Sequence, residues 1–220
     1  MSTHSSNPSV VPLSNTAVYQ LAFVKRCHEI LGRGYQNLHP QDLHQAQETE
    51  ITGELVKAMR DFLEGDDGPS WGSHFFIADD PPQNAPGRLG KKRRRVDIEF
   101  ERAQRGPRPR LHFEAKRLHK SGSTAEYLGE DGLSLFVKGE YAAKQNAGAM
   151  LGYIQKKKPT EWIEKIRTSL TASPKRYSFK LVPGLVKERL TVHLAETHRS
   201  NHDRKKLGRP IAIYHTFLQF

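Results

Sequence analysis

Cysteine is almost absent from this sequence, because Cys27 is the single example among 220 residues. One thiol cannot form an intramolecular disulfide or build a cysteine-based zinc site, and such scarcity fits a reducing compartment. The sequence also lacks an uninterrupted apolar run of the roughly 20 residues that a membrane span needs, and no apolar signal segment follows its first residues. We therefore expect a cytoplasmic protein that is neither a disulfide scaffold nor a membrane protein.

Two nucleotide-binding signatures are missing as well. The sequence contains no G-x-x-x-x-G-K-[S/T] P-loop and no dinucleotide-binding fingerprint. Eleven histidines are present, and His198 and His202 stand four residues apart, as zinc ligands on one helical face would. The stretch between them is polar and loop-like, and no third ligand lies nearby, so the sequence argues against a zinc site.

Positive charge is what the sequence has in excess. It contains 35 Lys and Arg residues against 24 Asp and Glu residues, which gives a formal net charge of +11 and a pI near 9.8. Such a balance favours a polyanionic partner, most often nucleic acid. With 36% hydrophobic and 27% charged residues, the composition is that of a soluble globular domain that can bury a real core.

The chain reads as one domain behind a short leader. Residues 1–15 are rich in serine, asparagine and proline, and we expect them to be a loose leader ahead of a single domain over residues 16–220. Periodicity predicts helices over residues 16–34, from about 42 to 62, 141–154 and 160–170. Alternation and apolar runs predict strands over 75–78, 96–101 and 111–116, a loop over 122–132, and closing apolar runs over 177–182, 190–194 and 211–220. This order predicts an α/β or α+β domain.

The most informative residues lie on two neighbouring predicted strands. Residues two apart in a strand project to the same face, so Glu114 and Lys116 share one face. Asp97 lies on the preceding strand of an expected hairpin. Two carboxylates from adjacent strands can converge on one hard cation such as Mg²⁺, and an ammonium beside them can orient or help deprotonate an attacking water. The alternative is an amphipathic strand with a solvated outer face.

A third carboxylate is predicted from the helix that precedes these strands. Glu48 falls on the same helical stripe as Leu55 and Met59, and an acidic residue on an inward face needs a partner or a metal. Glu50 and Glu54 point further away. An acidic first turn, favoured by the helix dipole, would explain these glutamates without any site.

The order of these motifs resembles a known enzyme family. A helix with E-T-E-I-T at 48–52, a strand carrying Asp97 and a strand reading F-E-A-K at 113–116 are similar to the PD-(D/E)xK phosphodiesterase superfamily, which has the restriction-endonuclease-like fold. The resemblance covers roughly residues 40–155 by motif and order. It departs from the family pattern at Val96, which stands before the first acid where proline is usual.

This resemblance implies an α/β fold with a central mixed sheet flanked by helices. It implies Mg²⁺ or Mn²⁺ held by Asp97 and Glu114, the Ala115 carbonyl as a third ligand, Lys116 near the nucleophilic water, and Glu48 completing the site. It also implies a hydrolase, specifically a Mg²⁺-dependent endodeoxyribonuclease acting on double-stranded DNA. A restriction or anti-phage defence role, as a homo-oligomer or with a partner defence protein, is the setting it suggests.

Basic residues near the predicted acids offer contacts to phosphates. A run that abuts Asp97 would place neutralising charge at the lip of the site, unless it is a solvated or nuclear-localisation-like string; it comprises Lys91, Lys92, Arg93, Arg94 and Arg95. Lys144 and Gln145, expected on the helix after the motif strand, are further candidates, or else part of a surface row. The alternative to a nuclease is a non-catalytic, basic nucleic-acid-binding module on the same fold, whose acids are structural.

Overall fold

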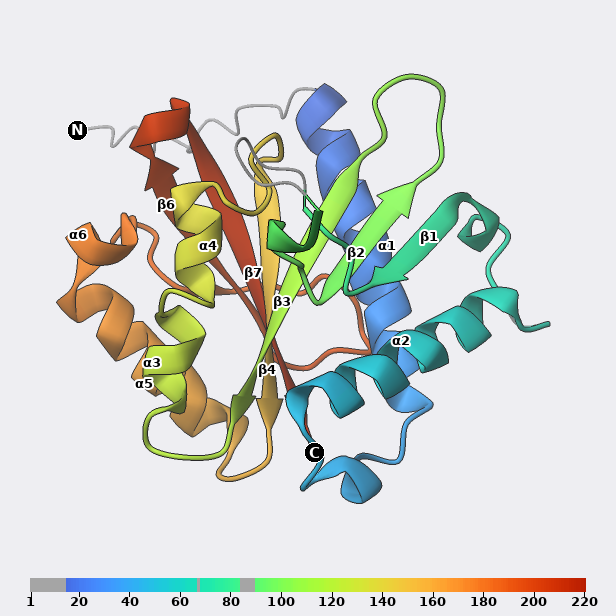
Figure 1. Cartoon of the computed structure of the whole chain (residues 1–220), viewed down its shortest axis with the longest axis horizontal. Helices are drawn as coiled ribbons and strands as arrows, with labels where there is room; N and C mark the ends of the chain where they lie inside the picture. Colours follow the sequence, from blue (N-terminus) through green and yellow to red (C-terminus); the bar gives the residue numbers. More distant parts are fainter. Residues whose placement is uncertain (1–14, 67, 84–89) are drawn as a thin grey trace, which may run out of the picture.

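The structure, a computed structural model, describes residues 15–66, 68–83 and 90–220. The strands in this part of the chain form one mixed sheet in the order β1-β2-β3-β4-β7-β6-β5, with helices on both faces (Figure 1). The strands are β1 (Phe75–Asp79), β2 (Ile98–Arg102), β3 (Arg110–Leu118), β4 (Ala147–Ile154), β5 (Val186–Lys187), β6 (Thr197–Arg204) and β7 (Arg209–Gln219). The helices are α1 (Asn15–Gln36), α2 (Glu48–Glu64), α3 (Ser123–Leu128), α4 (Leu133–Lys138), α5 (Pro159–Ala172) and α6 (Pro174–Tyr177). The predicted α/β class, a mixed sheet flanked by helices, is confirmed, whereas the predicted leader lies outside the described residues except for Asn15.

The centre of the sheet is parallel and its two sides are antiparallel. β3, β4 and β7 run in the same direction, and the remaining strands extend the sheet through antiparallel pairs. The pairing of β2 with β3 reaches from Glu101 opposite Arg110 to Ile98 opposite Phe113, whereas β3 continues to Leu118. The last part of β3 therefore extends beyond its β2 partner, and this is where the candidate site lies.

Two hydrophobic cores hold the layers together, one on each face of the sheet. α1 and α2 pack on one face, where Leu55 and Phe113 belong to the same cluster. α3, α4 and α5 pack on the other face, where Phe136, Ile166 and Met150 belong to a second cluster. Full burial of each such side chain contributes roughly 1.5–3 kcal/mol. The position of β3 between these two layers fixes which way its alternate side chains point.

Most elements before residue 120 agree with their predictions, but the predicted helix over 141–154 is wrong. This segment forms a turn followed by strand β4. β4 lies between β3 and β7 and is buried on both faces, so it shows no alternation that would mark it as a strand. Its small residues allow close packing: a Cβ at Gly148 would lie 2.6 Å from the ring of Phe136, and one at Gly152 would lie 2.7 Å from the ring of Phe217.

The C-terminal half of the fold departs from prediction in two further places. Helix α3 lies within the predicted loop over 122–132. The apolar runs over 177–182 and 190–194 do not become strands of the sheet, whereas the polar segment of β6 does. The strand was missed because its buried side chains, which include His198, Ser200 and His202, are polar and lack the hydrophobic signal of a strand.

Candidate active site

The candidate site is built on the part of β3 that extends beyond its pairing with β2. Asp97, which immediately precedes β2, accepts a hydrogen bond from the backbone N–H of Ala115 at 2.6 Å. Glu48 accepts one from the backbone N–H of Arg117 at 3.1 Å. Two carboxylates thus accept hydrogen bonds from backbone N–H groups of β3 that the backbone of a longer β2 would otherwise have accepted. We name this place the notch; it comprises the side chains of Glu48, Asp97, Glu114 and Lys116 and the backbone of β3 from Glu114 to Arg117.

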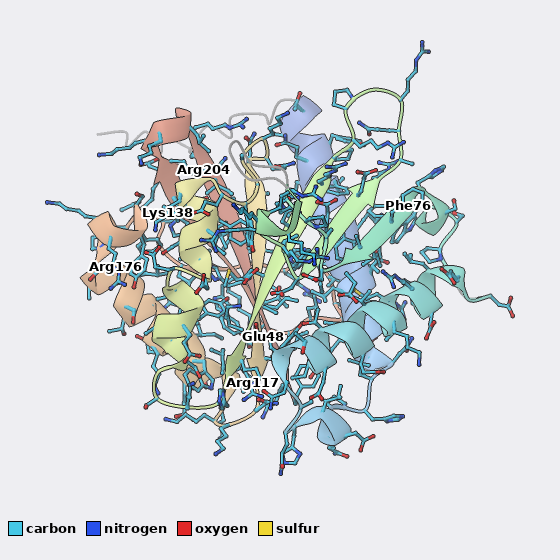
Figure 2. All side chains as sticks on the ribbon, in the orientation of Figure 1. Glu48, Phe76, Arg117, Lys138, Arg176 and Arg204 are labelled. Atoms are coloured by element: carbon cyan, nitrogen blue, oxygen red, sulfur yellow. The ribbon has the colours of Figure 1, made fainter. Side chains whose placement is uncertain are left out.

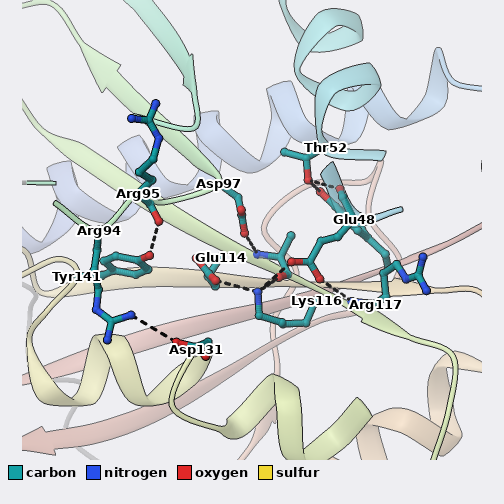
Figure 3. A network of polar contacts seen from close by, with 12 residues as sticks. Glu48, Thr52, Arg94, Arg95, Asp97, Glu114, Lys116, Arg117, Asp131 and Tyr141 are labelled. Carbon is teal, nitrogen blue, oxygen red and sulfur yellow. Dashed lines mark hydrogen bonds and ion pairs between the residues drawn. The ribbon is translucent and has the colours of Figure 1, made fainter. Parts of the chain in front are cut away.

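Lys116 lies among the oxygens of the notch (Figure 3). Its ammonium donates to Glu114 Oε1 at 2.8 Å, to Glu48 Oε1 at 3.0 Å and to the carbonyl oxygen of Ala115 at 2.6 Å. Burial lowers the pKa of Lys116, but the surrounding carboxylates more than offset that effect and hold the pKa above its ordinary value. The ammonium is therefore charged at neutral pH.

The two acids predicted as metal ligands are both poorly hydrated. Burial raises the pKa of Asp97 to about 6, although the charge of Lys116 acts in the opposite direction. Burial, followed by the negative charge of Asp97, raises the pKa of Glu114 to about 8. Glu114 Oε2 is buried and has no hydrogen-bond partner within the described residues. The three acidic side chains of the notch thus face a single ammonium, in surroundings that stabilise negative charge poorly, and Glu114 is mostly protonated at neutral pH.

Helix α2 brings Glu48 to the notch. Glu48 is the first residue of α2, and Glu50 supports this helix start by accepting the backbone N–H of the preceding residue, Gln47, at 2.6 Å. Thr52 Oγ1 donates to the Glu48 carbonyl at 2.8 Å. Glu54 is exposed. Of the three glutamates weighed in the sequence, Glu48 is the one whose carboxylate contacts Lys116, while Glu50 serves the helix cap.

The donors of the notch suit a hard divalent cation in kind and in charge. Oxygens of Glu48, Glu114 and Ala115 surround one cationic group, and Asp97 lies beside them. Mg²⁺ and Mn²⁺ bind oxygen ligands of these types. Across residues 15–66, 68–83 and 90–220, however, no three Asp, Glu, His or Cys side chains stand close enough together to form a metal-binding group. The residues fit such an ion in chemistry, while their present spacing accommodates an ammonium.

Two arginines of the basic run are paired with protein acids. Arg94 pairs with Asp131 at 3.3 Å and with Glu140 at 2.5 Å, and Arg95 pairs with Asp80 at 2.5 Å. These ion pairs reduce what Arg94 and Arg95 can offer to a phosphate. The rest of the run lies in or beside the short helix η3 (Gly90–Lys92), where both lysines are exposed; it comprises Lys91, Lys92 and Arg93.

Lys144 and Gln145 lie away from the notch. They precede β4 at the opposite end of the sheet, where Arg204 Nη2 donates to the Gln145 carbonyl at 2.6 Å. Figure 2 shows Arg204 well separated from Glu48 and Arg117, which belong to the notch. Both residues instead line a cavity of about 810 Å³ beside the start of α1. The expected helix that would have presented them to the site is replaced by a turn and a strand.

Two residues beside the notch were not among the predicted site residues. Tyr141, which is buried, donates its O–H to the backbone carbonyl of Arg95 and so connects the basic run to the segment after α4 (Figure 3). Arg117 donates to the Ala46 carbonyl at 3.0 Å and to Gln47 Oε1 at 2.8 Å. Arg117 could have been predicted as a neighbour of the site, because it follows Lys116 in the sequence. The contact of Tyr141 with Arg95 could not, because no local motif connects these two residues.

A string with the spacing of a nucleophile elbow, G-P-S-W-G at 68–72, is also present. An elbow places its serine on a sharp turn that leads from a strand into a helix. Here the string follows α2 and runs into the short helix η2 (Gly72–His74) and then β1. It therefore lacks the structural context of an elbow.

Comparisons of the chain with protein-family models, with curated proteins and with solved structures found no match. The notch and the fold around it are therefore the basis on which a function can be inferred. None of the described helices combines the length and the apolar character needed to cross a membrane.

Proposed function

We propose that this protein is a metal-dependent nuclease with a restriction-endonuclease-like fold, and that it hydrolyses DNA phosphodiester bonds. One observation carries the proposal. Asp97 beside β2, Glu114 and Lys116 on β3, and Glu48 from the preceding helix meet at one place. This is the constellation that a resemblance to the PD-(D/E)xK superfamily requires, and it joins segments that are far apart in the sequence.

The residues of the notch would divide the chemistry between them. Asp97, Glu114 and the Ala115 carbonyl, with Glu48, would hold Mg²⁺ or Mn²⁺, which supplies Lewis acidity and an activated water when bound. Lys116 is protonated, because the carboxylates around it keep its pKa high. It would therefore act as a hydrogen-bond donor to a phosphate oxygen and stabilise the charge that develops in the transition state.

The charge of the whole chain supports a nucleic-acid substrate. A formal net charge of +11 attracts polyanions, and the exposed Lys91 and Lys92 are close in sequence to Asp97. We extend the proposal to double-stranded DNA as the substrate and to a cytoplasmic restriction or anti-phage role. Assembly as a homo-oligomer or with a partner defence protein belongs to the same proposal.

One observation favours a second function, that of a nucleic-acid-binding module which does not cut. The acids of the notch are bonded to an ammonium and to backbone amides, and the described residues contain no ready-made group of metal ligands. A cluster of ion pairs of this kind can have a purely structural role, in which it satisfies the backbone amides of β3 that β2 does not pair. In that case the basic surface would bind nucleic acid and the notch would be structural.

A panel of substrates separates the two functions. Supercoiled plasmid, single-stranded DNA and RNA are incubated with the purified chain, with Mg²⁺ or with EDTA, and both cleavage and binding are recorded. The nuclease proposal predicts that plasmid is cut with Mg²⁺ and left intact with EDTA. Binding of plasmid without cleavage, in either Mg²⁺ or Mn²⁺, would contradict it and support the binding module.

A further inference from the structure

The ammonium of Lys116 uses all of its hydrogen-bonding capacity inside the notch. An ammonium has three N–H donors, and these point to Glu48 Oε1, Glu114 Oε1 and the Ala115 carbonyl at 2.6–3.0 Å. The same oxygens are the ones that would bind a divalent cation. Two cations cannot occupy one position, so the arrangement of Lys116 excludes a metal ion as long as it lasts.

We propose that Lys116 is a resident counter-cation which a divalent metal ion must displace. The ammonium and the metal bind the same three oxygens in alternation, and the notch accepts a metal only when Lys116 leaves it. This inference rests on the metal site of the proposed function. It adds that the lysine competes with the metal before the reaction, rather than standing beside a preformed site.

The charge in the notch favours such an exchange. The acidic side chains of Glu48 and Glu114 contact one ammonium, and that of Asp97 lies beside them. Glu114 is only 6% exposed, and its Oε2 has no hydrogen-bond partner in the part of the chain that the structure describes. A divalent ion carries twice the charge of an ammonium and attracts each carboxylate correspondingly more strongly. A divalent ion can therefore displace the ammonium of Lys116, even though the lysine is covalently attached to the site.

Exchange would also couple metal loading to substrate binding. Once Lys116 is released from the three oxygens, the bound metal ion repels its ammonium. The ammonium has also lost the carboxylates that paired with it. The nearest compensation is an anion that arrives from outside, such as a phosphate oxygen of the substrate. Metal binding would thus turn Lys116 from a partner of the protein into a partner of the substrate.

The first test measures the affinity for Mn²⁺ alone, by calorimetry on the full chain without nucleic acid. Lys116→Met removes the competitor, and we expect it to bind Mn²⁺ at least about tenfold more tightly than the wild type. Arg117→Met is the matched control, because it removes one positive charge from the next residue, whose guanidinium contacts Ala46 and Gln47 rather than these oxygens. We expect the control to change the affinity by less than about threefold.

Equal effects of the two substitutions would show that general electrostatics is at work, and would overturn the exchange. An unchanged affinity of Lys116→Met would overturn it as well. If neither the wild type nor either variant binds Mn²⁺, the metal site of the proposed function fails. If the wild type binds Mn²⁺ and cuts DNA while the two variants behave alike, the exchange alone fails.

A second measurement uses the wild type and so does not depend on how the variant folds. The side-chain nitrogen of Lys116 is followed by NMR in protein with labelled lysines, with Lys116→Arg identifying its signal. Without metal we expect an ammonium whose protons exchange slowly with water, because all three are hydrogen-bonded. At saturating Mg²⁺ we expect fast exchange typical of a released lysine. An ammonium that stays protected while Mg²⁺ is bound would contradict the displacement.

Discussion

At the scale of single residues, two carboxylates of the notch each perform a structural task. One oxygen of Asp97 accepts the N–H of Ala115, and one oxygen of Glu48 accepts the N–H of Arg117. The amide oxygen of an asparagine or glutamine could still accept the hydrogen bond from the backbone N–H, while the charge and the second acceptor oxygen are lost. Amide substitutions can therefore separate the chemistry of the notch from its architecture, which alanine substitutions would disturb together.

Glu48 provides the first such test. Glu48→Gln should lower the rate of plasmid cleavage by about 10- to 100-fold, as the loss of a supporting group in a metal site does, with little change in the thermal unfolding temperature. Glu54→Gln is the matched control, since Glu54 is exposed on the same helix and should leave both values unchanged. A damaging Glu54→Gln together with a silent Glu48→Gln would contradict the placement of Glu48 in the site.

Lys116 provides the second test. Lys116→Met should reduce cleavage by about 10²- to 10³-fold, which is the usual loss when one positioned hydrogen-bond donor to developing charge is removed. The loss should persist at saturating Mg²⁺, because the missing ammonium cannot be replaced by the metal. Single-turnover cleavage rates over a range of Mg²⁺ concentrations check this, and restoration of the wild-type rate by high Mg²⁺ would refute a role for the ammonium in the reaction.

At the scale of secondary structure, the predictability of each element follows its burial. β2 and β3 alternate between apolar and charged residues because one of their faces carries the polar site, and both were predicted. β4 is buried on both faces and was taken for a helix, and β6 buries polar side chains and was missed. Local sequence patterns identify a strand well when one of its faces is buried and the other is polar. Strands such as β4 and β6 depend instead on pairing with strands that are distant in the sequence.

The basic run divides into two parts that should behave differently. Lys91 and Lys92 are exposed, whereas Arg94 is paired with Asp131 and Glu140. Each phosphate contact contributes about −0.9 to the slope of log K against log salt, so replacing both lysines by glutamine should flatten that slope by about 1.8. Arg94→Gln should leave the slope nearly unchanged. Salt titrations of DNA binding check both variants, and the reverse pattern would show that Arg94 leaves its acids to contact DNA.

A chain of buried hydrogen bonds connects β6 and β7 with α3 and α6. The Tyr177 carbonyl can only accept, so His202 must donate to it from Nδ1, at 2.8 Å. His202 Nε2 then accepts from the hydroxyl of Ser200 at 2.7 Å, and Ser200 accepts from Nε2 of His215 at 2.7 Å. The hydroxyl of Tyr127 completes the chain by donating to His215 Nδ1 at 3.0 Å. Both histidines are neutral in this arrangement.

This chain of buried hydrogen bonds predicts that the folded protein loses stability in mild acid. Burial lowers the pKa of His202 from its ordinary 6.5 to about 4, so the unfolded chain takes up a proton before the folded one does. The contribution of His202 is complete above pH 6.5 and is lost as the pH falls toward 4. His202→Gln keeps a donor and an acceptor but does not titrate. The stability difference between wild type and variant, measured by urea unfolding, should shrink by about 2 kcal/mol from pH 7 to pH 5.

The comparison with the variant is needed because other groups titrate in the opposite sense. The raised pKa values of Asp97 and Glu114 favour the folded state in acid, and both residues are present in wild type and variant alike. His198 and Asp203, which lie near this chain of hydrogen bonds, are likewise present in both wild type and variant. A difference that is constant from pH 7 to pH 5 would show that His202 is not buried in its neutral form.

At the scale of the whole molecule, the sequence could predict the α/β class and the residues that the notch brings together, but not how they are held. The alternation of β3 placed Glu114 and Lys116 on one face, and the helical stripe selected Glu48. The backbone pairing that ends at Ile98, and the contact of Lys116 with three oxygens, depend on strand register, which no local pattern reports. Lys144 and Gln145 were misplaced for the same reason, because they depended on the nature of the next element.

The most direct test of the central claim compares the wild type with Asp97→Asn in a single assay of supercoiled plasmid cleavage in Mg²⁺. Asp61→Asn, an exposed change on α2, is the matched control. The account predicts cleavage by the wild type and the control and none by Asp97→Asn, which should remain folded and still bind DNA. Cleavage by Asp97→Asn at the wild-type rate, at equal folded concentration, would contradict the assignment of the notch as the active site.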